Sequence, residues 1–324
     1  MTQAYLPHSA APALLVAGLI GVLLLAGHAL GQARPARAVV GAAWLLAVAA
    51  VIAVAWPCRA QPDGFRMAAI IVVALVGMKV VVLASARAAG MPPLRAAPWL
   101  GFALGWPGMQ PRIFLRRSHR PLAGGAGLLR GGALRLALGV ALVFLARLVW
   151  VWTGSSLLAT APALIGLSLA LHFGVFDLLT GIWRLAGVDV GSPFRAPLRS
   201  TSLREFWGRR WNLAFSEMTS IAVYRPLSAR VGRGPATAAA FLFSGLLHEM
   251  AISLPVGAGF GLPMLYFVLH GALMLVERAA QRRGQPVAGA GGRAWTLAWL
   301  VLPLPLLFHP WFLAGVIWPL VGIG

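Results

Sequence analysis

The chain has 324 residues, of which 60% are hydrophobic and 10% are charged, and its mean hydropathy is +0.83. This composition excludes a soluble domain and predicts an all-α polytopic integral membrane protein. The net charge of +20 comes almost entirely from arginines at the ends of apolar runs, which is typical of cations at a membrane surface rather than of nucleic-acid binding. The single cysteine, Cys58, excludes an intrachain disulfide and a cysteine-rich metal site.

Membrane-spanning helices need about 20 apolar residues to cross a hydrocarbon core about 30 Å thick. Seven segments meet this requirement: 12–31, 38–57, 67–86, 133–152, 160–182, 235–254 and 261–278. Residues 294–322 are apolar but contain four prolines, so one kinked span or two short ones are expected. Residues 94–109 are too short and too rich in proline for a full span, and a re-entrant or interfacial element is expected. About 8–9 transmembrane helices are therefore predicted.

A single membrane domain, 1–324, should hold all of these spans. Its expected parts are the N-terminal spans (1–111), the middle spans (112–186), a cytosolic or interfacial loop (187–234) and the C-terminal spans (235–324). Arginines are concentrated in the connections 112–120, 195–233 and 278–293, whereas 153–160 and 255–261 carry no charge. The positive-inside rule then predicts that the Arg-rich connections face the cytosol. The expected location is the cytoplasmic membrane of a bacterium.

The first informative polar segment is Ser202-Leu-Arg-Glu-Phe-Trp-Gly-Arg-Arg-Trp-Asn212. Ser202 and Glu205 have the spacing of a capping box, so a helix should begin at Leu203 and end before Pro226. At 100° per residue this helix separates into an apolar and a polar face. The apolar face holds Leu203, Trp207, Trp211, Ala214, Met218 and Ile221, and the polar face holds Glu205, Arg209, Asn212, Ser216 and Thr219.

This division predicts an amphipathic helix that lies at the membrane surface. An ordinary amphipathic helix with arginines along its edge explains most of the segment. It leaves Asn212 unexplained, because nothing in helix stability requires an asparagine one turn after Arg209.

The second polar segment, Ser244-Gly-Leu-Leu-His-Glu249, lies inside a predicted span. Ionisable groups in a span cost roughly 2.5–3.5 kcal/mol on insertion scales and usually face a cavity. His248 shares a helical stripe with Thr237, Phe241 and Ser244, while Glu249 points about 100° away. A lone intramembrane histidine is often only a hydrogen-bonded packing residue, so both interpretations of His248 stay open on the pattern alone.

A third stripe in the next span combines Tyr266, His270, Met274 and Glu277. We expect His270 and Glu277 to join a buried polar network, with a supporting role around the site as the alternative. A structural ion pair between Asp177 and an arginine of a neighbouring span, such as Arg147, is also expected.

The two polar segments, together with Phe267-Val-Leu-His-Gly271 and Glu277, resemble the wax-synthase branch of the membrane-bound O-acyltransferase family, over roughly Pro197 to Glu277. Trp106-Pro-Gly-Met-Gln-Pro-Arg112 resembles the family more weakly. The resemblance implies transfer of an acyl group from acyl-CoA to a hydroxyl, with no cofactor and no metal. It also implies catalytic roles for His248 and Asn212.

The implied mechanism uses His248 as the general base, since an unperturbed histidine pKa of about 6.5 leaves it mostly neutral in the cytosol. Asn212 would position the acyl carbonyl or stabilise the oxyanion. Arg209 and Arg210 would hold the phosphates of acyl-CoA. Trp207, Trp211 and Ser244 are further candidate substrate-binding residues, with Glu249, His270 and Glu277 supporting the site.

The expected acceptor is a lipophilic alcohol that arrives through the bilayer, a long-chain primary alcohol before a sterol. Another O-acyltransferase of the same family, with a short-chain donor or a sterol, glycolipid or polysaccharide acceptor, is the nearer alternative. A transporter in which His248 and Glu277 line a polar pathway is the more distant one. The sequence carries no indication of the oligomeric state.

Overall fold

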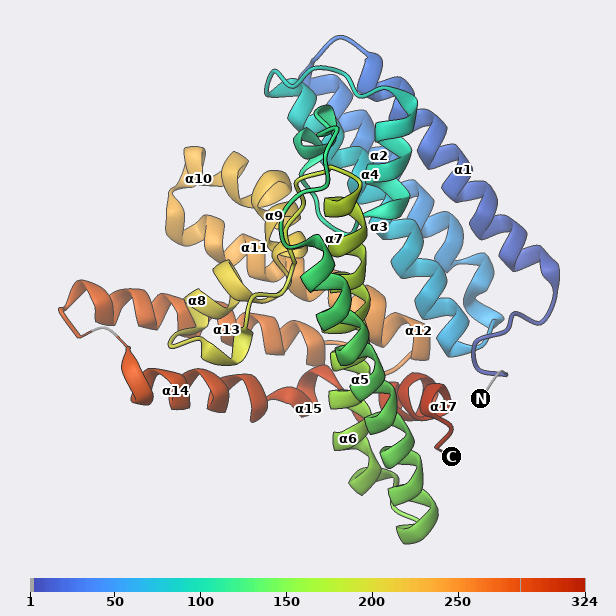
Figure 1. Cartoon of the computed structure of the whole chain (residues 1–324), viewed down its shortest axis with the longest axis vertical. Helices are drawn as coiled ribbons and strands as arrows, with labels where there is room; N and C mark the ends of the chain where they lie inside the picture. Colours follow the sequence, from blue (N-terminus) through green and yellow to red (C-terminus); the bar gives the residue numbers. More distant parts are fainter. Residues whose placement is uncertain (1–2, 286, 324) are drawn as a thin grey trace. The chain divides into compact units, whose positions relative to one another are not determined.

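A computed structural model describes residues 3–285 and 287–323, and these separate into two compact units. Unit 1 comprises Met1–Ser192 and Leu313–Gly324, and unit 2 comprises Pro193–Phe312. Helices account for the regular structure of both units, and no strand occurs in the described part of the chain (Figure 1). The all-α class predicted from composition is confirmed, whereas the division of one membrane domain at residues 111, 186 and 234 stays a prediction.

Unit 1 is built mainly from long apolar helices. They are α1 (Ala10–Gln32), α2 (Arg37–Ala55), η1 (Pro57–Ala60), α3 (Asp63–Ala88), α4 (Ala96–Gly105), η2 (Pro111–Leu115), α5 (Gly125–Thr153), α6 (Ser156–Ser168), the π-helical turn η3 (Leu169–Val175) and α7 (Phe176–Leu185), with η8 (Leu313–Ile317) and α17 (Trp318–Val321) near the C-terminus. Helices α6, η3 and α7 form one continuous span, Ser156–Leu185.

Unit 2 begins with short, irregular helices and continues with longer ones. They are η4 (Pro197–Arg199), α8 (Leu203–Glu205), η5 (Phe206–Arg210), α9 (Leu213–Thr219), η6 (Ser220–Tyr224), α10 (Arg225–Val231), α11 (Arg233–His248), η7 (Glu249–Ser253), α12 (Leu254–Val256), α13 (Leu262–Arg282), α14 (Gly289–Val301), α15 (Leu304–Leu307) and α16 (Pro310–Phe312). Of these, η5, η6 and η7 are π-helical turns.

Seven continuous helices among the described residues are long and apolar enough to cross a membrane. Each overlaps one of the seven predicted spans, and the observed and predicted ends differ by up to about eight residues. The apolar segment near the C-terminus is broken at Phe308 and His309 into Gly289–Leu307 and Pro310–Val321, which raises the count to eight. The predicted total of about 8–9 is therefore met at its lower end. The short helix α4 confirms that residues 94–109 do not form a full span.

Close helix packing in unit 1 depends on glycines that face a neighbouring backbone. A Cβ atom on Gly139 of α5 would lie 2.5 Å from the backbone nitrogen of Ala170, and one on Gly174 would lie 2.9 Å from Leu136 Cα. Membrane helices associate through such small residues because lipid provides no hydrophobic driving force between them. The α5 helix and the α6–α7 span therefore form a tight antiparallel hairpin.

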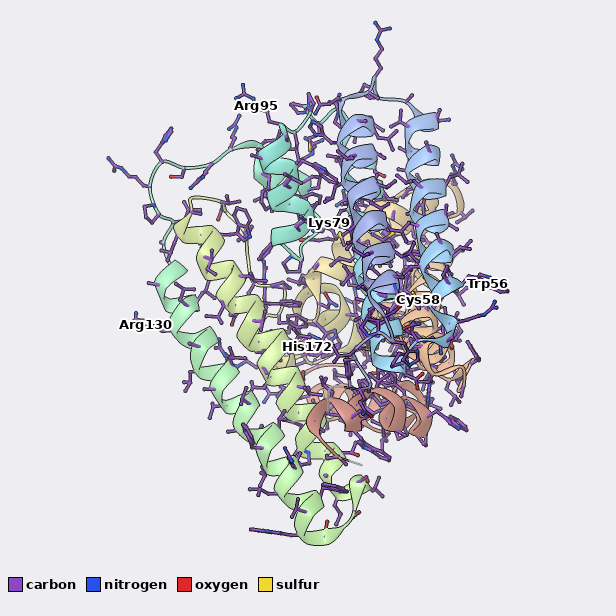
Figure 2. All side chains as sticks on the ribbon, turned by 90° about the vertical axis from the view of Figure 1, so that its right-hand side faces the viewer. Trp56, Cys58, Lys79, Arg95, Arg130 and His172 are labelled. Atoms are coloured by element: carbon purple, nitrogen blue, oxygen red, sulfur yellow. The ribbon has the colours of Figure 1, made fainter. Side chains whose placement is uncertain are left out.

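Buried polar groups in unit 1 find partners inside that unit. Lys79 of α3 is fully buried and donates hydrogen bonds to the carbonyl oxygens of Trp106, at 2.7 Å, and Gly108. Figure 2 shows Lys79 among the helices of unit 1, whereas Arg95 and Arg130 extend outward. The Lys79 ammonium also lies 4.0 Å from the ring centroid of Phe102. The Trp106-Pro-Gly segment is thus held in place by a buried cation.

The predicted ion pair between Asp177 and an arginine of a neighbouring span forms, but the partner is Arg135 of α5 and not Arg147, the example that the sequence suggested. Asp177 pairs with Arg135 at 2.6 Å and accepts a hydrogen bond from Ser192 Oγ at 2.6 Å. Arg147 is exposed on α5, three helical turns beyond Arg135. The hairpin register brings Arg135 rather than Arg147 level with Asp177, and that register is not encoded in residue spacing along either helix.

Candidate active site

The core of unit 2 is the pairing of α11 with α13 (Figure 1). Two glycines allow the close approach: a Cβ on Gly245 would lie 3.1 Å from Met264 Cα, and one on Gly271 would lie 3.1 Å from Phe241 Cβ. The two helices run antiparallel, since the start of α13 lies beside the end of α11. This pairing places His248, the last residue of α11, against the first turns of α13, where Phe267 lies.

The imidazole of His248 is oriented by backbone and by aromatic rings. Its Nδ1 lies 2.7 Å from the carbonyl oxygen of Ser244, which can only accept a hydrogen bond, so Nδ1 carries the proton. In the neutral ring Nε2 then holds the free lone pair. Phe267 of α13 covers the ring at a centroid distance of 4.1 Å, and Phe215 of α9 lies at 5.7 Å. His248 therefore presents Nε2 as a proton acceptor in the interior of unit 2.

Ser244 was predicted to bind substrate. The structure shows that it orients the ring through its backbone carbonyl, one helical turn before His248. The Ser244 residue is buried. A direct contact of Ser244 with substrate stays a prediction.

The structure corrects the single amphipathic helix predicted from Leu203 to before Pro226. The helix begins at Leu203 as the capping box predicts, with Ser202 Oγ accepting from the backbone N–H of Glu205 at 3.1 Å. It ends at Arg210, and Trp211 is extended. A second helical stretch then runs from Leu213 to Val231, in which Pro226 lies just after the π-helical turn η6. The predicted faces hold only within each stretch.

Asn212 is the residue at which the backbone reverses. It has a left-handed conformation (φ 41°, ψ 61°), and its Oδ1 accepts a hydrogen bond from the backbone N–H of Phe215 at 3.2 Å. Asparagine is favoured for both tasks, because it tolerates positive φ and caps helix N-termini. Helix capping thus supplies the structural reason for Asn212 that the sequence pattern lacked. The cap also connects it to the site, since the Phe215 ring contacts His248.

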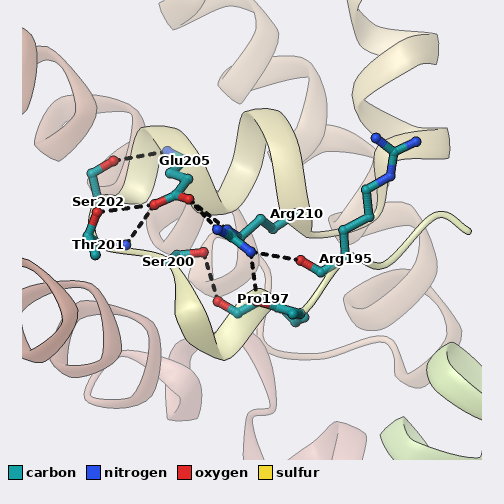
Figure 3. Close-up of polar contacts among 8 residues, drawn as sticks. Arg195, Pro197, Ser200, Thr201, Ser202, Glu205 and Arg210 are labelled. Atoms are coloured by element: carbon teal, nitrogen blue, oxygen red, sulfur yellow. Dashed lines mark hydrogen bonds and ion pairs between the residues drawn. The ribbon is translucent and has the colours of Figure 1, made fainter.

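The capping carboxylate Glu205 determines what Arg210 can do. Glu205 accepts hydrogen bonds from the backbone N–H and hydroxyl of Thr201, and it pairs with Arg210 at 2.6 Å (Figure 3). Arg210 also donates to the carbonyl oxygens of Arg195 and Ala196. The backbone N–H of Thr201, followed by Arg210, lowers the pKa of Glu205 below its usual value. The guanidinium of Arg210 is therefore occupied by contacts within this loop, whereas Arg209 is exposed.

Trp207 and Trp211 lie in the aromatic interior of unit 2. Trp211 stacks on Phe206 with ring centroids 5.4 Å apart, and Trp207 lies between Phe267, at 5.7 Å, and His270, at 5.5 Å. The Nε1 atom of Trp207 is buried and has no hydrogen-bond partner among the described residues. Phe267 therefore contacts both the Trp207 ring and the His248 ring.

The three residues predicted to support the site have separate structural roles. His270 is fully buried and its Nδ1 bonds the carbonyl of Tyr266 at 2.8 Å. Glu249 Oε1 accepts from the backbone N–H groups of Gly261 and Met264, both at 2.9 Å, and so caps α13. Glu277 accepts from the N–H groups of Leu203 and Arg204 and from Trp295 Nε1. His270 and Glu277 do not bond each other.

Sequence reasoning missed a basic pocket of about 550 Å³ at the end of the α11–α13 pair opposite His248. Four arginines line the pocket: Arg204, Arg233, Arg278 and Arg282. None of its lining residues among those described is acidic. Tyr224, Ser228, Thr237 and Gln281 add hydroxyl and amide groups. Arg278 and Arg282 are one helical turn apart, which is the signal that could have found the pocket. The arrangement suits an anion with several phosphate oxygens.

The pocket and His248 are connected along α11. Thr237 lines the pocket and His248 ends the same helix, about 16 Å further along at 1.5 Å per residue. Phe241 and Ser244 lie between them on one stripe of this helix. The basic pocket and His248 thus lie at opposite ends of one helix pair. No group of three or more metal-binding side chains occurs in the described part of the chain.

Comparison with known proteins identifies the region that holds this site. Residues 191–269 match the model of the membrane bound O-acyl transferase family. The resemblance to that family is confirmed. The matched region of this O-acyltransferase family includes Asn212, His248 and Phe267, and it ends just before His270.

Several curated relatives share part of the chain. A protein of Arabidopsis thaliana named probable long-chain-alcohol O-fatty-acyltransferase 9 is 32% identical over 145 residues, which is 39% of this chain and 41% of the relative. Probable long-chain-alcohol O-fatty-acyltransferase 7 of the same plant is 30% identical over 48% of this chain and 49% of the relative. The long-chain-alcohol O-fatty-acyltransferase of Simmondsia chinensis is 33% identical over 36% of this chain and 39% of the relative. The chain therefore spans less than half the length of these relatives.

Proposed function

We propose that this protein transfers an acyl group from acyl-CoA to the hydroxyl of a lipophilic alcohol. The observation that carries the proposal is the fixed tautomer of His248, which leaves Nε2 as a base inside a membrane helix pair. The basic pocket at the other end of that pair supports a donor with phosphates. The names of the relatives support a long-chain alcohol as acceptor.

In the proposed reaction His248 Nε2 takes the proton of the alcohol hydroxyl while the alcohol oxygen attacks the thioester carbonyl carbon. The carbon–sulfur bond then breaks, and the leaving thiolate of CoA receives the proton from the imidazolium. The products are an ester and free CoA. Asn212 caps Phe215, whose ring lies 5.7 Å from the ring of His248, and it is the proposed donor to the oxyanion, through its amide nitrogen, because its Oδ1 is already occupied by the cap of α9.

The donor phosphates are assigned to the four-arginine pocket, with Arg209 as a secondary candidate. Arg210 is a poorer choice than the sequence suggested, because its guanidinium is already paired with Glu205. The proposed location is the cytoplasmic membrane of a bacterium, with the Arg-rich loops in the cytosol where acyl-CoA is available.

Release of free CoA, detected as a thiol, tests this function directly. The purified protein should release CoA from a long-chain acyl-CoA only when an alcohol is added. Activity should rise with alcohol length, because each added methylene improves partitioning by about 0.8 kcal/mol until the cavity is filled. Highest activity with a soluble sugar, and equal rates across alcohol lengths, would favour a polysaccharide-acylating enzyme instead. No CoA release with any acceptor would favour a transporter.

A further inference from the structure

The anion pocket is assembled from two separate parts of unit 2, and one buried carboxylate joins them. Helix α13 contributes Arg278 and Arg282, while Arg204 comes from α8, more than 70 residues earlier in the chain. Glu277 of α13 is buried, and its two carboxylate oxygens accept the backbone N–H groups of Leu203 at 2.8 Å and Arg204 at 3.0 Å. These contacts fix the first turn of α8 to α13.

The side chain of Arg204 is fixed from the same helix. Its Nη1 donates to Gln281 Oε1 at 3.1 Å, and Gln281 lies one turn after Glu277 on α13. Arg204 is thus held at its backbone by Glu277 and at its guanidinium by Gln281. Both anchors come from α13, the helix that also carries Arg278 and Arg282 of the pocket.

Such anchoring has an electrostatic reason. Four guanidinium groups that line one pocket repel each other when no anion is bound. Arg204 is exposed, so without its anchors it could move into solvent and away from the other three. Holding it in place before the ligand arrives reduces the ordering cost of binding.

We propose that Glu277 is a positioning residue that sets the affinity for the phosphate groups of the acyl donor by holding Arg204 in the pocket. This inference rests on the proposed function for the identity of the donor. It gives Glu277 a role in binding rather than in the chemical step, since the carboxylate contacts two backbone amides and the indole Nε1 of Trp295 and no reacting group.

The test uses free CoA as the ligand of the purified full-length protein, so that binding is measured without catalysis. Glu277→Gln keeps the size of the side chain but loses the carboxylate, and it should raise the Kd for CoA about 10-fold, the effect of one lost charge-assisted contact. Turnover at saturating acyl-CoA should stay close to wild type. Arg204→Gln should raise the Kd by a similar factor, and the double variant should be no weaker than Arg204→Gln alone, because both changes remove one contact.

Arg199→Gln is the matched control, because it removes an exposed arginine from the same loop outside the pocket, and its Kd should equal that of wild type. Gln281→Leu removes the side-chain anchor of Arg204 together with one amide that lines the pocket, and it should raise the Kd at least about 3-fold, which keeps the inference testable if Glu277→Gln does not fold. An unchanged Kd in either anchor variant, or effects of Glu277 and Arg204 that multiply, would overturn the inference.

The same experiment separates this inference from the proposed function. Wild-type protein that binds CoA with these variant effects but forms no ester would refute acyl transfer and retain the role of Glu277. Ester formation by wild type, with an unaltered Kd for CoA in Glu277→Gln, would support acyl transfer and refute the role of Glu277. Failure of wild type to bind CoA would overturn both.

Discussion

Units 1 and 2 both bury polar side chains among apolar helices, but they treat them differently. In unit 1, Lys79 bonds two carbonyl oxygens, and Asp177 is shared between Arg135 and Ser192. In unit 2, three buried side-chain atoms have no hydrogen-bond partner within the described residues: Trp207 Nε1, Glu249 Oε2 and His270 Nε2. Both units thus use buried polar groups to hold helices together, but unit 2 also keeps unpaired polar atoms in its interior.

Lys79→Met should have the largest effect, and that effect should be on stability. Removal of the ammonium leaves the buried carbonyls of Trp106 and Gly108 without a donor, so we expect a loss of roughly 2–5 kcal/mol. Turnover of the folded fraction should be unchanged. Thermal unfolding in detergent, followed in parallel with activity, checks both. A loss of turnover without destabilisation would give unit 1 a chemical role and break the comparison.

Asn212→Asp separates the structural and chemical roles of that residue. Aspartate retains the oxygen that caps α9 and tolerates positive φ, so stability should stay near wild type. Loss of the amide donor should lower kcat about 100-fold if it contacts the oxyanion. Asn212→Gly, which keeps the left-handed backbone without either group, should lose similar activity. If Asn212→Asp keeps the kcat of wild type, Asn212 acts only as the cap of α9 and has no role in the chemical step.

The two basic regions give the next contrast. Arg278→Gln in the pocket of unit 2 should raise KM for acyl-CoA about 10-fold, and high salt should weaken binding further. Arg116→Gln, which removes an exposed arginine from the loop of unit 1, should leave KM unchanged. Equal effects of the two variants would show that the arginines act through general surface charge rather than through a defined pocket.

The smallest effect concerns pH. Because its contacts lower the pKa of Glu205 in the folded protein, the ionised carboxylate contributes stability that is fully present above the usual carboxyl pKa. That contribution is lost as the pH falls through the lowered pKa. Glu205→Gln should therefore show a smaller loss of stability than wild type on acidification. Unfolding curves measured at several pH values below neutrality test this, and parallel curves would contradict it.

The sequence predicted elements whose signals are local. Span positions followed from runs of apolar residues, the start of α8 from Ser202 and Glu205, and the break near residue 309 from the prolines. It could not predict that Asp177 would meet Arg135 or that Arg204 would join Arg278, because these pairs depend on helix register and packing. The sequence placed Asn212 on the polar face of one continuous helix, because helical periodicity was extended through a residue that has a positive φ and caps the next helix.

The account depends most on His248 as the base. The decisive measurement is CoA release from long-chain acyl-CoA in the presence of a long-chain alcohol, for wild type, His248→Ala and His172→Ala, with CoA binding measured on each. His172 is the matched control, a histidine of unit 1 that bonds Ser168 at 3.1 Å. We expect His248→Ala to bind CoA normally and to lose at least about 100-fold in turnover, and His172→Ala to retain it. A well-folded His248→Ala protein with wild-type turnover would contradict the mechanism.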